Sequence, residues 1–253
     1  MKKIIVPALI SFTLILSAEA AEDTKSLESL LPAETVLVMA APNYASAKKH
    51  FKGGASARFW DSAEFKPFRK KLVNGFEENL LVRIEEELAI DFEAFEEMAS
   101  GPVALAVVPG QAAGEEPALL LLLDAGRKSF ALRRTLSRME RDWKKADRKV
   151  SETEIGGVEF TTLSEPEGNR QMHVGRVGAQ LIIGTKPAQI EGVLVRLNGK
   201  GDGTLADNEA FAASHRALLK EADFYVWANP SAVLPQLLDN LPDGAELGID
   251  FGE

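Results

Sequence analysis

Two short, uninterrupted apolar runs near the middle of the chain constrain its fold more than any other feature. Residues 103–108 read VALAVV and residues 118–123 read ALLLLL, with a polar loop between them. Each run is too short for a typical helix, whereas a central strand that is covered on both faces has this composition. The two runs therefore predict a hairpin of central strands with other elements packed on both of its faces.

Apolar residues recur every three or four positions over residues 62–88 and 128–149, which predicts two amphipathic helices. Further strands are predicted at residues 35–41, 158–163, 171–176, 180–184 and 224–228. Further helices are predicted at residues 44–51, 92–98, 187–197, 208–220 and 231–241. This order predicts an α+β fold, a mixed and mainly antiparallel sheet with helices packed on it. We expect a single domain over residues 21–241.

The first twenty residues have the parts of a secretory leader. Two lysines precede an apolar stretch over residues 4–16, and Ala18-Glu19-Ala20 supplies a small-x-small cleavage site. The apolar stretch is shorter than the ~20 residues that a membrane-spanning helix needs. We therefore expect residues 1–20 to be a signal peptide that is cleaved between Ala20 and Ala21, and the protein to be periplasmic or secreted.

Composition excludes several classes of function. The sequence has no cysteine, so no disulfide stabilises the exported protein and its core alone must hold it together. Cysteine-ligated zinc, iron–sulfur clusters and thiol catalysis are excluded for the same reason. The formal net charge of −9 opposes binding to nucleic acid. No second apolar stretch is long enough to span a membrane, so we expect no transmembrane segment after cleavage.

Known catalytic and ligand-binding motifs are incomplete in this sequence. Ser46 and Lys49 have the Ser-x-x-Lys spacing of penicillin-recognising enzymes, but the companion motifs are missing. Residues 198–209 resemble a calcium loop, except that a lysine takes the place of a ligand oxygen. The three histidines are far apart in sequence and lack metal-ligand spacing: His50, His173 and His215. We therefore predict no metal site, no cofactor and no catalytic residue.

Charge is segregated along the chain. Residues 127–149 carry ten basic side chains against three acidic ones, and residues 77–97 carry nine acidic against one basic. A basic amphipathic helix can lie on an anionic lipid surface or dock an acidic partner, such as another envelope protein. The alternative is that both stretches are ordinary solvated helix faces that lie side by side. The residues of the predicted docking face are Arg133, Arg134, Arg138, Arg141 and Lys145.

The missing motifs and the basic helix together favour a non-catalytic role, as a binding or scaffold module of the cell envelope. Two alternatives stay open. An enzyme could assemble its site from Asp, Glu, His and Tyr residues that are distant in sequence, because such a site leaves no linear motif. A carrier of an apolar ligand could line its cavity with the apolar strands.

Two short segments recur late in the chain. LAIDF at residues 88–92 is matched by LGIDF at 247–251, and DSAEF at 61–65 is weakly matched by DNEAF at 207–211. Both pairs accompany a predicted strand-then-helix unit. The matches predict a degenerate internal repeat in which residues 242–253 begin a truncated second copy, with chance similarity as the alternative.

Several segments together resemble a known family. They are the LPAET lead into the first strand, residues 88–109, the apolar strand that ends at Asp124, GGVE at 156–159 and LADNEAF at 205–211. This set resembles a family of exported bacterial proteins that is catalogued only as a domain of unknown function, number thirty-three fifty-two. The resemblance covers most of residues 30–241 and implies the fold and the compartment, without catalytic or binding residues to transfer. Family members tend to be longer, which implies that this chain is the N-terminal part of such a protein.

Overall fold

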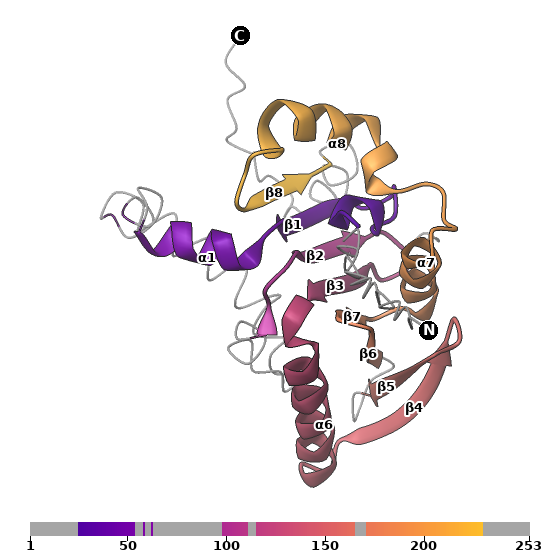
Figure 1. Cartoon of the computed structure of the whole chain (residues 1–253). Coiled ribbons are helices and arrows are strands. Elements are labelled where there is room, and N and C mark those ends of the chain that lie inside the picture. The colour runs from indigo at the N-terminus through magenta and orange to yellow at the C-terminus, as the bar shows by residue number, and fades with distance from the viewer. Residues whose placement is uncertain are drawn as a thin grey trace, which may run out of the picture.

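Eight strands form one sheet in the computed structural model, which describes residues 25–53, 58, 62, 98–110, 115–164 and 171–229 (Figure 1). The strands are β1 (Leu37–Ala41), β2 (Val103–Val108), β3 (Ala118–Asp124), β4 (Lys149–Ile155), β5 (Val158–Ser164), β6 (Gln171–Val177), β7 (Gln180–Gly184) and β8 (Tyr225–Ala228). Their order is β4-β5-β6-β7-β3-β2-β1-β8, and every pairing between neighbours is antiparallel. The predicted α+β class is confirmed.

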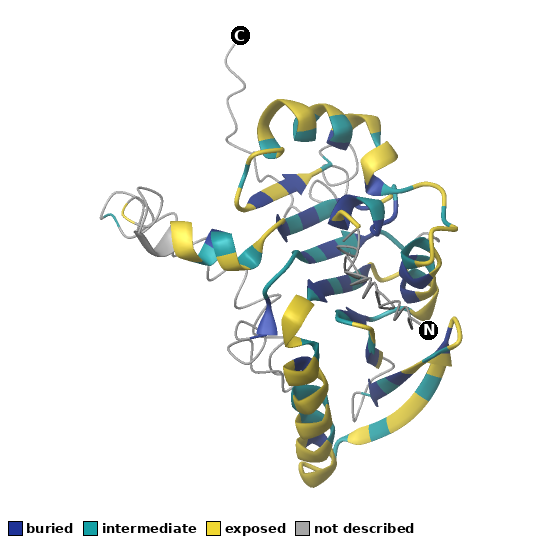
Figure 2. Ribbon diagram, in the orientation of Figure 1, coloured by how far each residue is buried: buried dark blue, intermediate teal, exposed yellow. Residues whose placement is uncertain are grey.

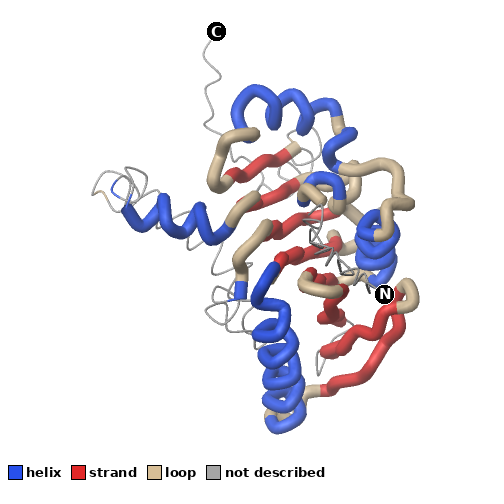
Figure 3. The backbone as a smooth tube through the Cα atoms, in the orientation of Figure 1, coloured by secondary structure: helices blue, strands red, loops and turns tan. Residues whose placement is uncertain are grey.

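Helices pack on both faces of this sheet, over different parts of it (Figure 3). Helix α6 (Ser129–Lys145) packs on one face and α7 (Pro187–Leu197) on the other, so we call these the α6 face and the α7 face. The remaining helical segments are η1 (Leu27–Ser29), α1 (Tyr44–Gly53), η3 (Gly126–Lys128), η4 (Leu205–Asp207), α8 (Glu209–Ser214) and the π-helix η5 (His215–Leu219). The predicted helix at 187–197 is confirmed in its full length.

The predicted central hairpin is confirmed, but its two faces are not equally covered. On the α7 face, Ala104 opposes Leu122 and both are fully buried in the larger core cluster. On the α6 face, Leu105 opposes Leu121 and both are only partly buried. The expectation that both faces would be covered thus holds for the α7 face alone within the described residues, because α6 packs against the other half of the sheet, β5 to β7.

One strand was missed by sequence reasoning, and one helix is shorter than predicted. The helix predicted at 128–149 ends at Lys145, and the chain continues as β4 from Lys149. Asp147 adopts a left-handed backbone conformation with φ of 55°, which ends the helix. Val150 fits the helical spacing, and the new strand is mostly polar and lacks an apolar alternation, so periodicity did not reveal it.

Several predictions lie outside the described residues: the signal peptide at 1–20, the helices at 62–88 and 231–241, most of the helix at 92–98, and the tail at 242–253. The strands of the two predicted repeat units are described. β1 and β8 are neighbours in the sheet, with Val38 opposite Trp227. Within the described part of the chain, no helix is long and apolar enough to cross a membrane.

Candidate functional site

Helix α6 has a more buried side and an exposed side (Figure 2). Leu132 is fully buried and Trp143 nearly so, and both belong to the core cluster on the α6 face of the sheet. Leu136 and Met139, at intervening turns, pack partly buried against the same cluster. These four positions follow the helical period, so the apolar side of α6 faces the core and its opposite side faces solvent.

The five predicted basic residues are all exposed on the outer side of α6, and we call them the basic face: Arg133, Arg134, Arg138, Arg141 and Lys145. Four of them follow one another at steps of four, three and four from Arg134, which places them in one stripe of the helix. The structure therefore brings together the side chains that sequence reasoning selected, on a rigid element anchored by Leu132 and Trp143.

The arginines of the basic face lack acidic partners in the described part of the chain. Lys145 pairs with Asp142 at 3.5 Å, and its neighbour Lys144 pairs with Glu140 at 2.5 Å. No described carboxylate lies within ion-pair distance of the four arginines. Among the described residues the positive charge of these arginines is therefore not neutralised by an ion pair. The alternative that the acidic stretch at 77–97 lies beside this helix concerns residues outside the described ones.

An exposed aromatic side chain lies at the start of the basic face. Phe130 is 66% exposed, and the guanidinium carbon of Arg133 lies 5.2 Å from the centroid of its ring. This distance is within the range of cation–π attraction, which holds the ring beside the basic residues. Phe130 precedes Arg134 by four residues and shares its side of the helix. Sequence reasoning did not single out this phenylalanine.

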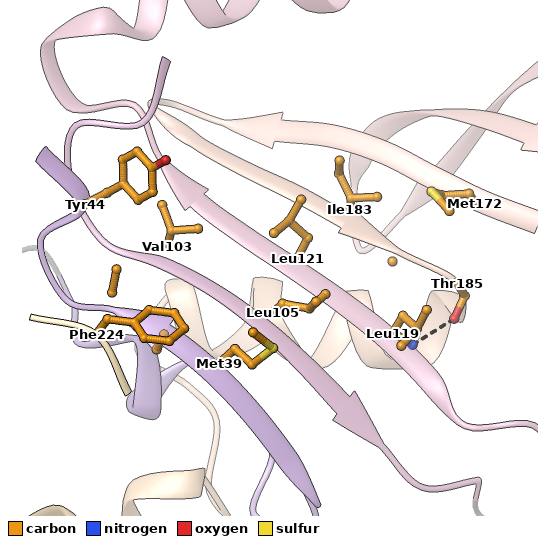
Figure 4. Close-up of a pocket in the computed structure, with 13 residues that line it drawn as sticks. Met39, Tyr44, Val103, Leu105, Leu119, Leu121, Met172, Ile183, Thr185 and Phe224 are labelled. Carbon is orange, nitrogen blue, oxygen red and sulfur yellow. Dashed lines mark hydrogen bonds between the residues drawn. The ribbon is translucent and has the colours of Figure 1, made fainter. Parts of the chain in front are cut away.

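A second feature, which we call the apolar groove, lies on the half of the α6 face that no described helix covers (Figure 4). Its floor is a row of opposed side chains across four strands: Ile183, Leu121, Leu105 and Met39. Tyr44 and Phe224 lie at one end and Thr185 at the other, and the groove has a volume of about 200 Å³. The Thr185 hydroxyl accepts a hydrogen bond from the Leu119 amide at 3.0 Å, so the lining offers little free polarity.

The structure also gathers titratable groups that are distant in sequence. The Tyr225 hydroxyl donates to Oε1 of the buried Glu28 at 2.6 Å, and Nε2 of His215 lies 3.6 Å from the same oxygen. Burial, together with the hydrogen bond to Glu28 and its charge, raises the pKa of Tyr225 far above its usual range. The hydroxyl is therefore a fixed donor at physiological pH, and the trio links η1 to β8 and η5 as a structural contact.

The other two histidines are separate from this trio. His50 forms an exposed pair with Asp223 at 2.8 Å. His173 is almost fully buried on the α7 face, where its Nδ1 lies 2.8 Å from the Thr162 hydroxyl. Burial lowers the pKa of His173, so its ring stays neutral. Among the described residues no three metal-ligating side chains come close enough together to hold a metal ion.

Comparisons with known proteins found no matching family model, no similar curated protein and no similar solved structure. The geometry of the described residues is therefore the basis for the proposals that follow.

Proposed function

We propose that this protein is an exported, non-catalytic binding module of the cell envelope that docks on an anionic phospholipid surface through the basic face of α6. The observation that supports the proposal most is the set of four exposed arginines without described acidic partners. Export rests on the predicted leader at residues 1–20 and on the resemblance to an exported family. Detection of a mature chain that begins at Ala21 would support export, and an intact leader on the soluble protein would contradict it.

Several arginines along one helix can interact with an anionic lipid surface at the same time. Each Lys or Arg near an anionic membrane surface contributes about 1 kcal/mol, so four arginines supply about 4 kcal/mol, roughly a thousandfold in affinity. The whole chain has a net charge of −9, which repels the same surface. A localised basic face on an acidic protein therefore orients the molecule with α6 toward the membrane.

Phe130 favours a membrane over an acidic protein partner. An aromatic ring that is two-thirds exposed beside cationic residues is typical of an interfacial helix, where the ring enters the boundary between headgroups and acyl chains. Its stacking with Arg133 keeps a guanidinium beside the ring, at the level of the lipid phosphates.

Co-sedimentation with vesicles tests the proposal. The parent protein should bind vesicles that contain phosphatidylglycerol and should not bind vesicles of phosphatidylcholine alone. Binding should weaken strongly between low salt and ~0.15 M salt, where the screening length falls to about 8 Å. The variant Arg134→Glu, Arg138→Glu, Arg141→Glu should lose at least about a hundredfold in affinity.

A matched control has the same change in net charge elsewhere on the surface. Lys49, Lys200 and Lys220 are exposed and lie outside α6. The variant Lys49→Glu, Lys200→Glu, Lys220→Glu should bind anionic vesicles within a few-fold of the parent. Equal losses in the two variants would show that net charge rather than the basic face governs binding, and would contradict the proposal.

The apolar groove favours a second candidate function, a carrier of an apolar ligand. A fully packed sheet would have excluded a carrier, and the described part of the α6 face is not fully packed. A displacement assay with a fluorescent fatty acid tests this alternative. Saturable binding that is lost in Leu105→Trp, which fills the groove, would support a carrier; binding that is absent or unchanged would contradict it.

A further inference from the structure

A polar groove lies between α6 and the strands β5 and β6, on the edge of the basic face. Its volume is about 390 Å³, within the range of small-ligand sites. Trp143 and Val174 contribute apolar surface, and Arg133 and Arg176 bring guanidinium groups from α6 and β6. Glu140 and Glu159 bring carboxylates from α6 and β5. We call it the α6–β6 groove.

The two guanidinium groups of this groove are held in place without acidic partners. Arg133 is stacked on the Phe130 ring, and Nη1 of Arg176 donates to the Gly178 carbonyl oxygen at 3.1 Å in the turn after β6. Neither arginine forms an ion pair with a described carboxylate. Two like charges that line one concave site repel each other, and a phosphate between them would relieve this repulsion.

The acidic side of the groove shows the opposite arrangement. Glu159 on β5 lies directly opposite Glu154 on β4, a like-charge pair that destabilises a sheet. Neither carboxylate forms an ion pair within the described part of the chain. Phe160 pairs with Gly175, so Glu159 comes opposite Arg176 one residue further along, and yet these two side chains do not form an ion pair. A ligand amine beside Glu159 would reduce the repulsion between the two glutamates, as a phosphate would reduce the repulsion between the two arginines.

We propose that the α6–β6 groove binds the phosphoethanolamine headgroup of a phospholipid. The phosphate lies between Arg133 and Arg176, which can each donate two hydrogen bonds, and the ammonium group donates to Glu159. Of the two carboxylates that line the groove, Glu140 is already paired with Lys144, so the ligand amine binds Glu159. This inference rests on the proposed docking, because the basic face brings the groove to the membrane surface, and it adds recognition of one headgroup.

Soluble headgroups test the groove without a membrane. Calorimetric titration of the parent protein with glycerophosphoethanolamine should show saturable binding, and glycerophosphocholine should bind about tenfold more weakly because its quaternary amine has no N–H to donate. Arg176→Gln should weaken both ligands about tenfold or more. Glu159→Gln should abolish the preference for ethanolamine over choline. Arg216→Gln and Glu221→Gln, both exposed and distant on η5 and after it, are the matched controls.

The outcomes separate this inference from the proposed docking. The variant Arg134→Glu, Arg138→Glu, Arg141→Glu should lose vesicle binding and still bind glycerophosphoethanolamine, because those residues do not line the groove. Arg176→Gln should still bind phosphatidylglycerol vesicles, but should no longer gain from added phosphatidylethanolamine. Equal affinity for inorganic phosphate and glycerophosphoethanolamine would reduce the site to a general phosphate site and overturn the headgroup assignment. Absence of saturable binding, or binding that Arg176→Gln leaves unchanged, would overturn the site itself.

Discussion

The variant Gly175→Ala tests how closely the sheet is packed against its own aromatic core. Gly175 on β6 lies opposite Phe160 on β5, which is fully buried on the α7 face. A methyl group on Gly175 would lie 2.5 Å from Cδ1, 2.6 Å from Cε1 and 2.8 Å from Cγ of the Phe160 ring. Non-bonded carbon atoms prefer about 3.5–4.0 Å, so the ring or the strand would have to move by about 1 Å.

The size of the effect follows from two opposing contributions. Overpacking of this kind costs about 1–3 kcal/mol, because the enclosed ring cannot swing into solvent. Alanine fits a strand better than glycine by about 0.5–1 kcal/mol, which offsets part of that cost. We therefore expect Gly175→Ala to lower the free energy of unfolding by about 1–2 kcal/mol and the thermal midpoint by about 2–8 °C.

Urea denaturation followed by circular dichroism measures this change, and a double-mutant cycle identifies its cause. Phe160→Leu shortens the side chain opposite the new methyl group, so Gly175→Ala should cost less in that background than in the parent. Additive losses in the double variant, or a Gly175→Ala protein as stable as the parent, would refute the argument from close packing.

Three further predictions concern single side chains. Burial lowers the pKa of His173 below its ordinary value of about 6.5, so the unfolded chain binds the proton more readily than the folded protein. The neutral ring's contribution to the free energy of unfolding is therefore complete above about pH 6.5 and is lost as the pH falls through the folded-state pKa. His173→Gln should flatten this dependence of stability on pH, measured by urea denaturation from about pH 7.5 to 5. Tyr225→Phe removes the donor to the buried Glu28 and should cost about 1.5–3 kcal/mol of unfolding free energy, whereas an unchanged stability would contradict that contact. Phe130→Ala should weaken binding to anionic vesicles about tenfold without lowering stability, and equal binding would show that the ring stays in water.

The central hairpin and the basic face could be predicted because each is encoded by local pattern. Uninterrupted apolar runs of six residues at 103–108 and 118–123 have few structural alternatives, and both became central strands. Steps of three and four between charged residues place them on one side of a helix wherever the helix packs. The exposure of Arg134, Arg138 and Arg141 followed from the apolar positions on the opposite side.

Features that depend on strand pairing could not be predicted in this way. The α6–β6 groove joins Arg133 and Arg176, which come from a helix and from a strand whose order in the sheet is not readable from local pattern. The contact of Glu28 with Tyr225 spans 197 residues. The edge strand β4 has mostly polar residues, so its sequence does not distinguish a half-exposed strand from the last turn of the preceding helix.

The contact between the basic face and the membrane can be measured directly, because the chain has no cysteine and accepts a single labelled one. Ala131 is exposed on α6 beside the basic face, and Ala213 is exposed on α8. An environment-sensitive fluorophore on Ala131→Cys should shift to the blue when phosphatidylglycerol vesicles are added, and the same label on Ala213→Cys should not shift. A shift at Ala213→Cys with none at Ala131→Cys would contradict docking through α6.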